Sequence, residues 1–193
     1  MYDEGKLMKT KIGAKNCLYP LPTVLVGANV NKKPNYIAIA HVGITSLGSV
    51  CLGLGKAHYT NAGIKKNKTF SVNTPSVRMV KETDYCGLVS GKSADKAALF
   101  NTFYGKLKTA PMIEECPINM ECKLITTVDL ANSEVFIGEV TATYCDETIL
   151  TDGVVDFGKV QPILFVMNDR SYWKLGERFA KAWDVGRELV QKK

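Results

Sequence analysis

The stretch from residue 120 to residue 145, MECKLITTVDLANSEVFIGEVTATYC, determines the fold expected for this chain. Side chains alternate along residues 120–130 and again along residues 134–145, as they do in β-strands, whose successive side chains point to opposite faces. The two runs are joined by a short link that contains Asn132-Ser133, and both residue types favour turns. So short a link connects antiparallel strands, and the stretch therefore predicts a long β-hairpin.

Short apolar runs elsewhere predict further strands. These strands are expected at residues 23–28, 36–40, 49–54, 69–73 and 162–166. Thr74 as a cap and Pro75 at the first helical position predict a helix that ends near residue 82. A second short helix is predicted at residues 93–100 with Ser93 as its cap, and residues 105–118 are expected to form a loop.

The sequence changes its period near the C-terminal end. From about Lys174, apolar residues recur every three or four positions, among them Leu175, Phe179, Trp183 and Leu189. This spacing places them on one face of a helix. It predicts a terminal amphipathic helix that packs on the rest of the chain or on a partner.

Together these elements predict a mainly β protein. The expected architecture is an antiparallel β-barrel with a few helices, formed by a single domain over residues 1–193, a common size for one domain. No regular crossover helix separates the predicted strands, and the sequence contains neither a P-loop nor a G-x-G-x-x-G motif. These features argue against a Rossmann fold.

The composition is that of an ordinary globular protein, with 46% hydrophobic and 23% charged residues. A net charge of +6 suits an anionic ligand but not the dense basic face of a nucleic-acid-binding protein. Residues 34–55 carry no charged side chain and are long enough to span a bilayer. Their glycines and polar residues instead favour two buried strands joined by a turn. Because residues 1–6 do not begin a signal peptide, a cytoplasmic location is expected.

The six cysteines do not form a metal-binding pattern. The sequence has no C-x-x-C and only two histidines, whereas a zinc site needs four ligands from tight clusters. We therefore expect no metal site, and reduced thiols that are mostly buried. Cys86 alone lies where a redox role is worth testing.

Residues 54–60, LGKAHYT, contain a candidate anion site. They follow a predicted strand and lead into a short helical pattern. Backbone N–H groups at a helix start, a capping hydroxyl and a lysine together favour a phosphate. Lys56, His58 and Thr60 are the candidates. The alternative is a solvated turn in which Thr60 only caps the helix.

Residues 85–96, YCGLVSGKSADK, contain a second candidate. Ser90 and Gly91 allow close approach to the backbone, and Lys92 and Lys96 add positive charge, with Asp95 placed to orient Lys96. The alternative is an ordinary helix start with a charge pair on its surface. The sequence has no G-x-S-x-G, and neither histidine has an Asp or Cys close by in sequence. No catalytic residue is therefore predicted, and a cofactor would have to carry any reaction.

Taken together, five segments resemble the flavin reductase-like, FMN-binding split-barrel family, and most closely its flavoredoxin branch. The resemblance runs from about Ile12 to Gly186. Its segments are GAKNCLYPLPTVLVG at 13–27, Pro34-Asn35 with the small residues at 38–40, KAHYT at 56–60, DYCGLVSGKSADK at 84–96 and YWKLG at 172–176.

The resemblance implies a homodimer of split β-barrels that holds FMN near the subunit interface. In such proteins the strand after the Pro-Asn turn lays its backbone along the edge of the flavin ring, and small side chains there allow close approach. In this sequence that role falls on Asn35, Ala38, Ile39, Ala40 and His41. The family often carries an aromatic residue where His41 stands, so the resemblance does not extend to the usual ring-stacking contact.

The resemblance also implies two groups of residues around the phosphate and ribityl chain. The first group is Lys56, His58, Tyr59 and Thr60, and the second is Ser90, Gly91, Lys92 and Lys96. Tyr172 and Trp173 would either cover the flavin of the partner subunit or serve in packing.

The predicted function is that of an FMN flavoprotein that accepts electrons from NADH, NADPH or a protein donor and passes them on. One alternative is an FMN carrier without turnover. Another is a nucleic-acid-binding barrel, which the sequence disfavours because aromatic and basic residues do not interleave on one strand face. We expect neither a nucleic acid nor a membrane as a partner.

Overall fold

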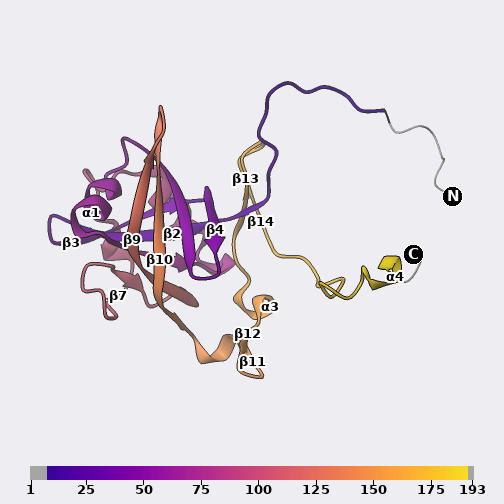
Figure 1. Cartoon of the computed structure of the whole chain (residues 1–193). Helices are drawn as coiled ribbons and strands as arrows, with labels where there is room; N and C mark the ends of the chain where they lie inside the picture. Colours follow the sequence, from indigo (N-terminus) through magenta and orange to yellow (C-terminus); the bar gives the residue numbers. More distant parts are fainter. Residues whose placement is uncertain (1–7, 191–193) are drawn as a thin grey trace.

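The computed structural model describes residues 8–190 and is built around a seven-stranded antiparallel sheet (Figure 1). The mainly β, antiparallel architecture expected from the sequence is confirmed. The strand order is β3-β2-β6-β9-β10-β5-β4. The bounds of these strands are β2 (Val24–Val30), β3 (Lys33–Ile39), β4 (Val42–Ser46), β5 (Ser49–Gly55), β6 (Thr69–Thr74), β9 (Ile118–Asp129) and β10 (Ser133–Cys145).

The two edge strands of this sheet, β3 and β4, are neighbours along the chain. Only Ala40 and His41 link them. The backbone N–H of Gly53 in β5 donates to the carbonyl oxygen of His41 at 2.7 Å, so the link is also tied to the sheet. The sheet therefore has to curl until its edges approach each other, and the result is a barrel that is split between β3 and β4.

The predicted hairpin is confirmed as β9 and β10, and its tip stands clear of the barrel in Figure 1. Its register shifts next to Gly138, where Phe70 packs against the space that a larger side chain would fill. Alternate residues of the strands point into the barrel, as the period of a strand requires. The core cluster contains Val24, Val26, Ala28, Ile37, Ile39, Leu52, Leu54, Ile64, Phe70, Val72, Cys122 and Phe136.

Short elements surround the barrel. The longest are helix α1 (Thr60–Asn67), which packs on β2, and helix α2 (Val80–Leu88), which packs on β3. A second sheet is formed by β1 (Leu21–Pro22), β13 (Leu164–Val166) and β14 (Ser171–Trp173). The other elements are β7 (Thr102–Phe103), β8 (Met112–Ile113), β11 (Leu150–Thr151), β12 (Val154–Val155), α3 (Phe157–Val160), α4 (Arg187–Val190) and three 3₁₀ turns at Val77–Met79, Lys96–Leu99 and Glu147–Ile149.

Two predicted helix starts are corrected. Thr74 is the last residue of β6 and pairs with Ile118, because strand pairing overrides the Thr-Pro capping signal. The helix begins six residues later, at Val80, and runs on to Leu88. The helix predicted at 93–100 is a 3₁₀ turn, Lys96–Leu99, capped by Asp95 and not by Ser93.

The segment 34–55 holds three strands where two were predicted. The additional strand, β4, pairs with β5 on the side away from β10. Within the described residues, no helix combines the length and the apolar character needed to cross a membrane. Residues 1–6, which carried the expectation about a signal peptide, lie outside the described part of the chain. All six cysteines are free, and Cys17 and Cys145 are exposed.

The predicted terminal helix is wrong over most of its length. In the described part of this segment only Arg187–Val190 is helical, and residues 174–180 have no regular structure. Phe179 and Trp183 are 98% and 94% exposed, so the described residues offer the apolar face no surface on which to fold. Figure 1 shows residues 174–190, here called the C-terminal arm, leading away from the barrel, as residues 8–20 also do.

Asn73 is a buried junction between four strands. Its amide nitrogen donates to the carbonyl oxygen of Leu25 in β2 at 2.8 Å. Its amide oxygen accepts from the side chain of Asn119 in β9 at 2.9 Å and from the backbone N–H of Ile113 in β8 at 3.2 Å. A single side chain on β6 thereby satisfies polar groups on three other strands.

We expect Asn73→Ala to lower the free energy of unfolding by about 3 kcal/mol, because each buried polar group left without its partner costs about 1–3 kcal/mol. Urea unfolding measures this change. Asn132→Ala, at the exposed hairpin tip, is the control and should change stability by less than about 0.5 kcal/mol. Similar stabilities for the two variants would contradict this role of Asn73.

Candidate functional site

The candidate site is a groove along the edge strand β3, where α2 and the loop after it cross the sheet. Two cavities that share Gly87 of α2 form it. One, of about 210 Å³, extends from Ile37 to the start of α1, to the end of α2 at Leu88 and to the loop at 89–91. The other, of about 100 Å³, lies farther along β3 and is bordered by Phe165 of β13 and Tyr172 of β14.

The polar end of the groove lies at the start of α1. Thr60 is the first residue of this helix, and Tyr59 occupies the N-cap position that was expected for Thr60. The Thr60 hydroxyl is buried and accepts a hydrogen bond of 2.7 Å from the side chain of Asn35. Because a hydroxyl is both donor and acceptor, its proton remains available to a ligand. The predicted strand, turn and helix are confirmed, and Asn35 joins them.

Lys96 brings positive charge to the same end. Its ammonium donates to the carbonyl oxygens of Cys86 at 3.1 Å and of Val89 at 3.0 Å, at the C-terminal end of α2. A cation at a helix C-terminus is favourable, and an ammonium has three N–H groups, so one remains free. Burial lowers the pKa of Lys96. Asp95 caps the following turn and so does not serve the orienting role expected for it.

His58 lines the same cavity. Partial burial of its ring lowers its pKa, and the nearby positive charge of Lys96 lowers it further. The imidazole is therefore neutral at pH 7, while a negative group bound beside it and Lys96 would favour its protonated form.

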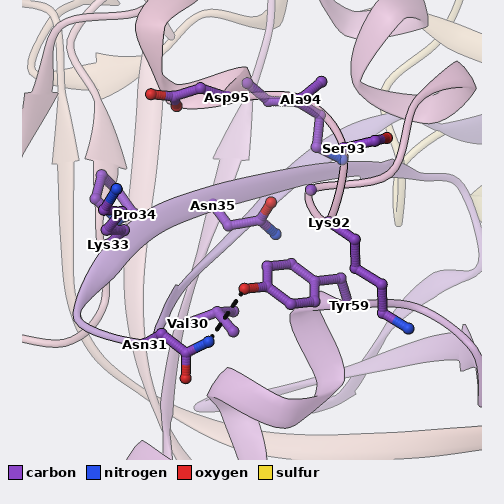
Figure 2. A pocket seen from close by; sticks show the side chains of 12 residues that line it. Val30, Asn31, Lys33, Pro34, Asn35, Tyr59, Lys92, Ser93, Ala94 and Asp95 are labelled. Atoms are coloured by element: carbon purple, nitrogen blue, oxygen red, sulfur yellow. Dashed lines mark hydrogen bonds between the residues drawn. The ribbon is translucent and has the colours of Figure 1, made fainter.

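A third cavity, of about 400 Å³, adjoins the polar end and shares Tyr59, Gly91 and Lys96 with it. Figure 2 shows Asn35 and Tyr59 beneath the turn that carries Lys92, with Lys33 and Pro34 across the hollow. A Cβ atom at Gly91 would collide with the Asn35 amide oxygen and would lie 2.8 Å from the Tyr59 ring. Only glycine lets this turn lie so close to the two side chains.

The other end of the groove is narrow and mostly apolar. Its floor is formed by Ala38 and Ala40, while Ile39 turns its side chain into the barrel core. Tyr172 covers one side, and its hydroxyl donates to Asp84 at 2.9 Å. Burial and the Asp84 carboxylate raise the pKa of Tyr172 to about 12, so it stays protonated.

The structure brings together all but two of the site residues expected from the sequence. The cavities are lined by Asn35, Ala38, Ile39, Ala40, His58, Tyr59, Thr60, Ser90, Gly91, Lys92 and Lys96. Lys56 turns away and pairs with Asp129 at 2.7 Å. His41 lies beyond the groove, with Nε2 3.3 Å from the Tyr19 hydroxyl. Roles of Lys56 and His41 in binding stay predictions.

Sequence reasoning missed several residues that line the groove. The sequence predicts Thr23 only as part of a strand. A hydroxyl side chain directly before an apolar run could have marked it as a candidate binding residue. Phe165 carried no local signal, because it reaches the groove through the pairing of β13 with β1. Tyr172 was expected either to cover a partner's flavin or to pack, and here it lines the groove of its own chain.

Comparison with known proteins gives a consistent result. The family model described as "Flavin reductase like domain" matches residues 16–171. Flavoredoxin from Methanosarcina acetivorans is 44% identical, with 95% of this chain and all of that chain covered and a TM-score of 0.92. Flavoredoxin of Desulfovibrio vulgaris (Miyazaki F) is 36% identical, with 93% of this chain and all of that chain covered and a TM-score of 0.87.

A curated protein is also similar to this chain in amino-acid sequence. An uncharacterized protein of Archaeoglobus fulgidus is 31% identical over 127 residues, which are 64% of this chain and 71% of that protein. The expected resemblance and the split-barrel fold are therefore confirmed.

The pKa of His58 tests whether a phosphate occupies the polar end. We expect FMN to raise this pKa, because the phosphate opposes the lowering by burial and by Lys96. Riboflavin, which has no phosphate, should raise it much less. The titration can be followed by NMR, with His41→Asn leaving a single imidazole signal to assign. Equal shifts with the two flavins would place the phosphate elsewhere.

Proposed function

Since this chain belongs to the flavin reductase-like domain family, we propose that it binds FMN noncovalently and passes electrons through it. The donor is NADH, NADPH or a redox protein. When bound, FMN supplies the electron-transfer chemistry, and the protein supplies binding, orientation and local charge. The observation that carries this proposal is the groove along β3, with a cationic polar end and a narrow apolar end.

The polar end has the donors that a phosphate requires. Thr60 and Lys96 each retain a free donor there, Ser90 lies on the rim, and Lys92 adds an exposed charge. Charge-assisted hydrogen bonds of this kind are the stronger ones in proteins. The proposal includes Lys56. Its ammonium, which pairs with Asp129, would leave that carboxylate and bind the phosphate instead.

The apolar end suits a flat ring. Ala38, Ala40 and Gly87 leave a slot between strand and helix, and a ring in it would lie against the backbone of an edge strand. Phe165 and Tyr172 border this slot and would exclude water from one side of the ring. The two ends of the groove thus match the anionic and the aromatic end of FMN in chemical character.

Cys86 lies next to the groove but is not in a state to react. Burial raises the pKa of its thiol to about 11. The reactive form of cysteine is the thiolate, so at neutral pH this residue acts as a small apolar side chain. Electron transfer is accordingly proposed to run through the flavin alone.

The test is anaerobic reduction of the purified protein. We expect the protein to be yellow, to release FMN on acid treatment, and to lose its visible flavin absorbance when NADH or NADPH is added, with dithionite as the control reductant. A colourless protein that leaves added FMN fluorescent would refute flavin binding. Bleaching by dithionite but by neither nucleotide would refute a nicotinamide donor and leave a carrier or a protein-driven electron-transfer protein.

We further propose that the chain forms a homodimer through its extended ends. Phe179 and Trp183 of the C-terminal arm and Leu18 of the N-terminal segment are largely exposed. Apolar side chains gathered on an extended segment mark an interaction surface. A second copy of the chain offers the same segments in return, as a two-fold interface requires.

We expect sedimentation to give a dimer at micromolar concentration and Trp183→Asp to shift it towards the monomer, because the carboxylate would be buried in the interface. Lys181→Asp introduces the same carboxylate at a polar position of the same arm and changes the net charge even more, yet it should leave the dimer intact. A wild-type monomer, or equal effects of the two variants, would argue against an interface formed by the arm.

A further inference from the structure

Thr23 carries a buried hydroxyl that the fold does not use. The residue is 3% exposed, and its Oγ1 is one of a few buried side-chain oxygens without a hydrogen-bond partner in the described structure. Its backbone N–H, in contrast, donates to Ile163 at 2.8 Å, so the residue is held firmly between β1 and β2. Buried hydroxyls normally have a partner, and an unpartnered one needs an explanation.

The position of Thr23 supplies that explanation. Thr23 lines the narrow end of the groove together with Ala38, Ala40 and Gly87. Because Val24 pairs with Ile39 in the β2–β3 register, Thr23 lies next to Ala40 at the floor of the slot. Beside these small side chains it carries a hydroxyl that no group in residues 8–190 engages.

We propose that Thr23 is a ring-recognition residue, whose hydroxyl donates a hydrogen bond to a nitrogen or carbonyl oxygen on the edge of the flavin ring. The inference deepens the proposed function and rests on it. An aromatic hydrocarbon of the same size would leave the hydroxyl unpaired, so the slot selects a flat heteroaromatic ring with an acceptor at its edge. This contact concerns the ring alone and is independent of the phosphate.

The structure contains a matched control. Thr83 in α2 also has a fully buried, unpartnered hydroxyl, but it lines neither of the two cavities that form the groove. Thr23→Val and Thr83→Val therefore make the same chemical change, the replacement of a buried hydroxyl by a methyl group of similar shape. Only Thr23→Val makes it at the proposed contact. Thr23→Ser restores the hydroxyl.

The experiment measures dissociation constants of FMN, riboflavin and lumiflavin, which carries the same isoalloxazine ring with only a methyl group in place of the ribityl chain. We expect Thr23→Val to weaken all three by a similar factor of about five, as the loss of one hydrogen bond predicts. Thr23→Ser should recover most of this loss, and Thr83→Val should bind as the wild type does. The visible spectrum of the bound flavin should change in Thr23→Val but not in Thr83→Val.

Thermal unfolding without flavin separates recognition from a structural role. Because both valine variants remove an unpaired buried hydroxyl, each should melt at or above the temperature of the wild type. Unchanged ring affinity in Thr23→Val, a loss confined to FMN, or an equal loss in Thr83→Val would overturn the inference. Wild-type protein that binds no flavin would instead refute the proposed function, and the inference with it.

Discussion

A strand at the edge of a sheet has a row of backbone N–H and C=O groups that no neighbouring strand satisfies, and β3 is such a strand. It does not pair with β4, the other edge, because the chain joins β5 directly after β3: the N–H of Gly53 in β5 donates to the His41 carbonyl, and β4 continues that pairing. The barrel must therefore stay split along β3. Helix α2 packs on β3 beside this opening, and the groove lies between the helix and the strand.

Local periodicity was sufficient to predict six of the seven strands of the main sheet, all except β4. The hairpin β9–β10 and the strands around Val24 and Ser49 follow from alternation and turn residues that lie within one short window. The helix starts failed where distant pairing decided the outcome, as at Thr74, which joins Ile118 across the sheet. The prediction of a terminal helix was wrong for a related reason. An amphipathic pattern indicates that one face needs to be covered, but it does not indicate which surface covers it.

The groove residues also differ in whether local sequence could predict them. His58, Thr60, Ser90 and Gly91 were found because each lies in a short motif that joins a strand or loop to a helix. Phe165 was not found, because its place depends on the pairing of Leu21 with a strand more than a hundred residues away. Lys56 shows that a local motif does not predict the direction of a side chain. Its backbone lies next to the groove, while its side chain turns to Asp129.

The two ends of the groove also differ in how binding relates to folding. At the polar end, the groups offered to a ligand already hold the fold together: Asn35 bonds Thr60, and Lys96 closes the C-terminal end of α2. Loss of affinity after a substitution there mixes two effects, since removing either partner also leaves a buried group unpaired. Thr23 is free of this coupling, because its hydroxyl has no hydrogen-bond partner in the described part of the chain. A buried group that folding leaves unpaired, at the wall of a cavity, is therefore the most direct sign of ligand chemistry in this structure.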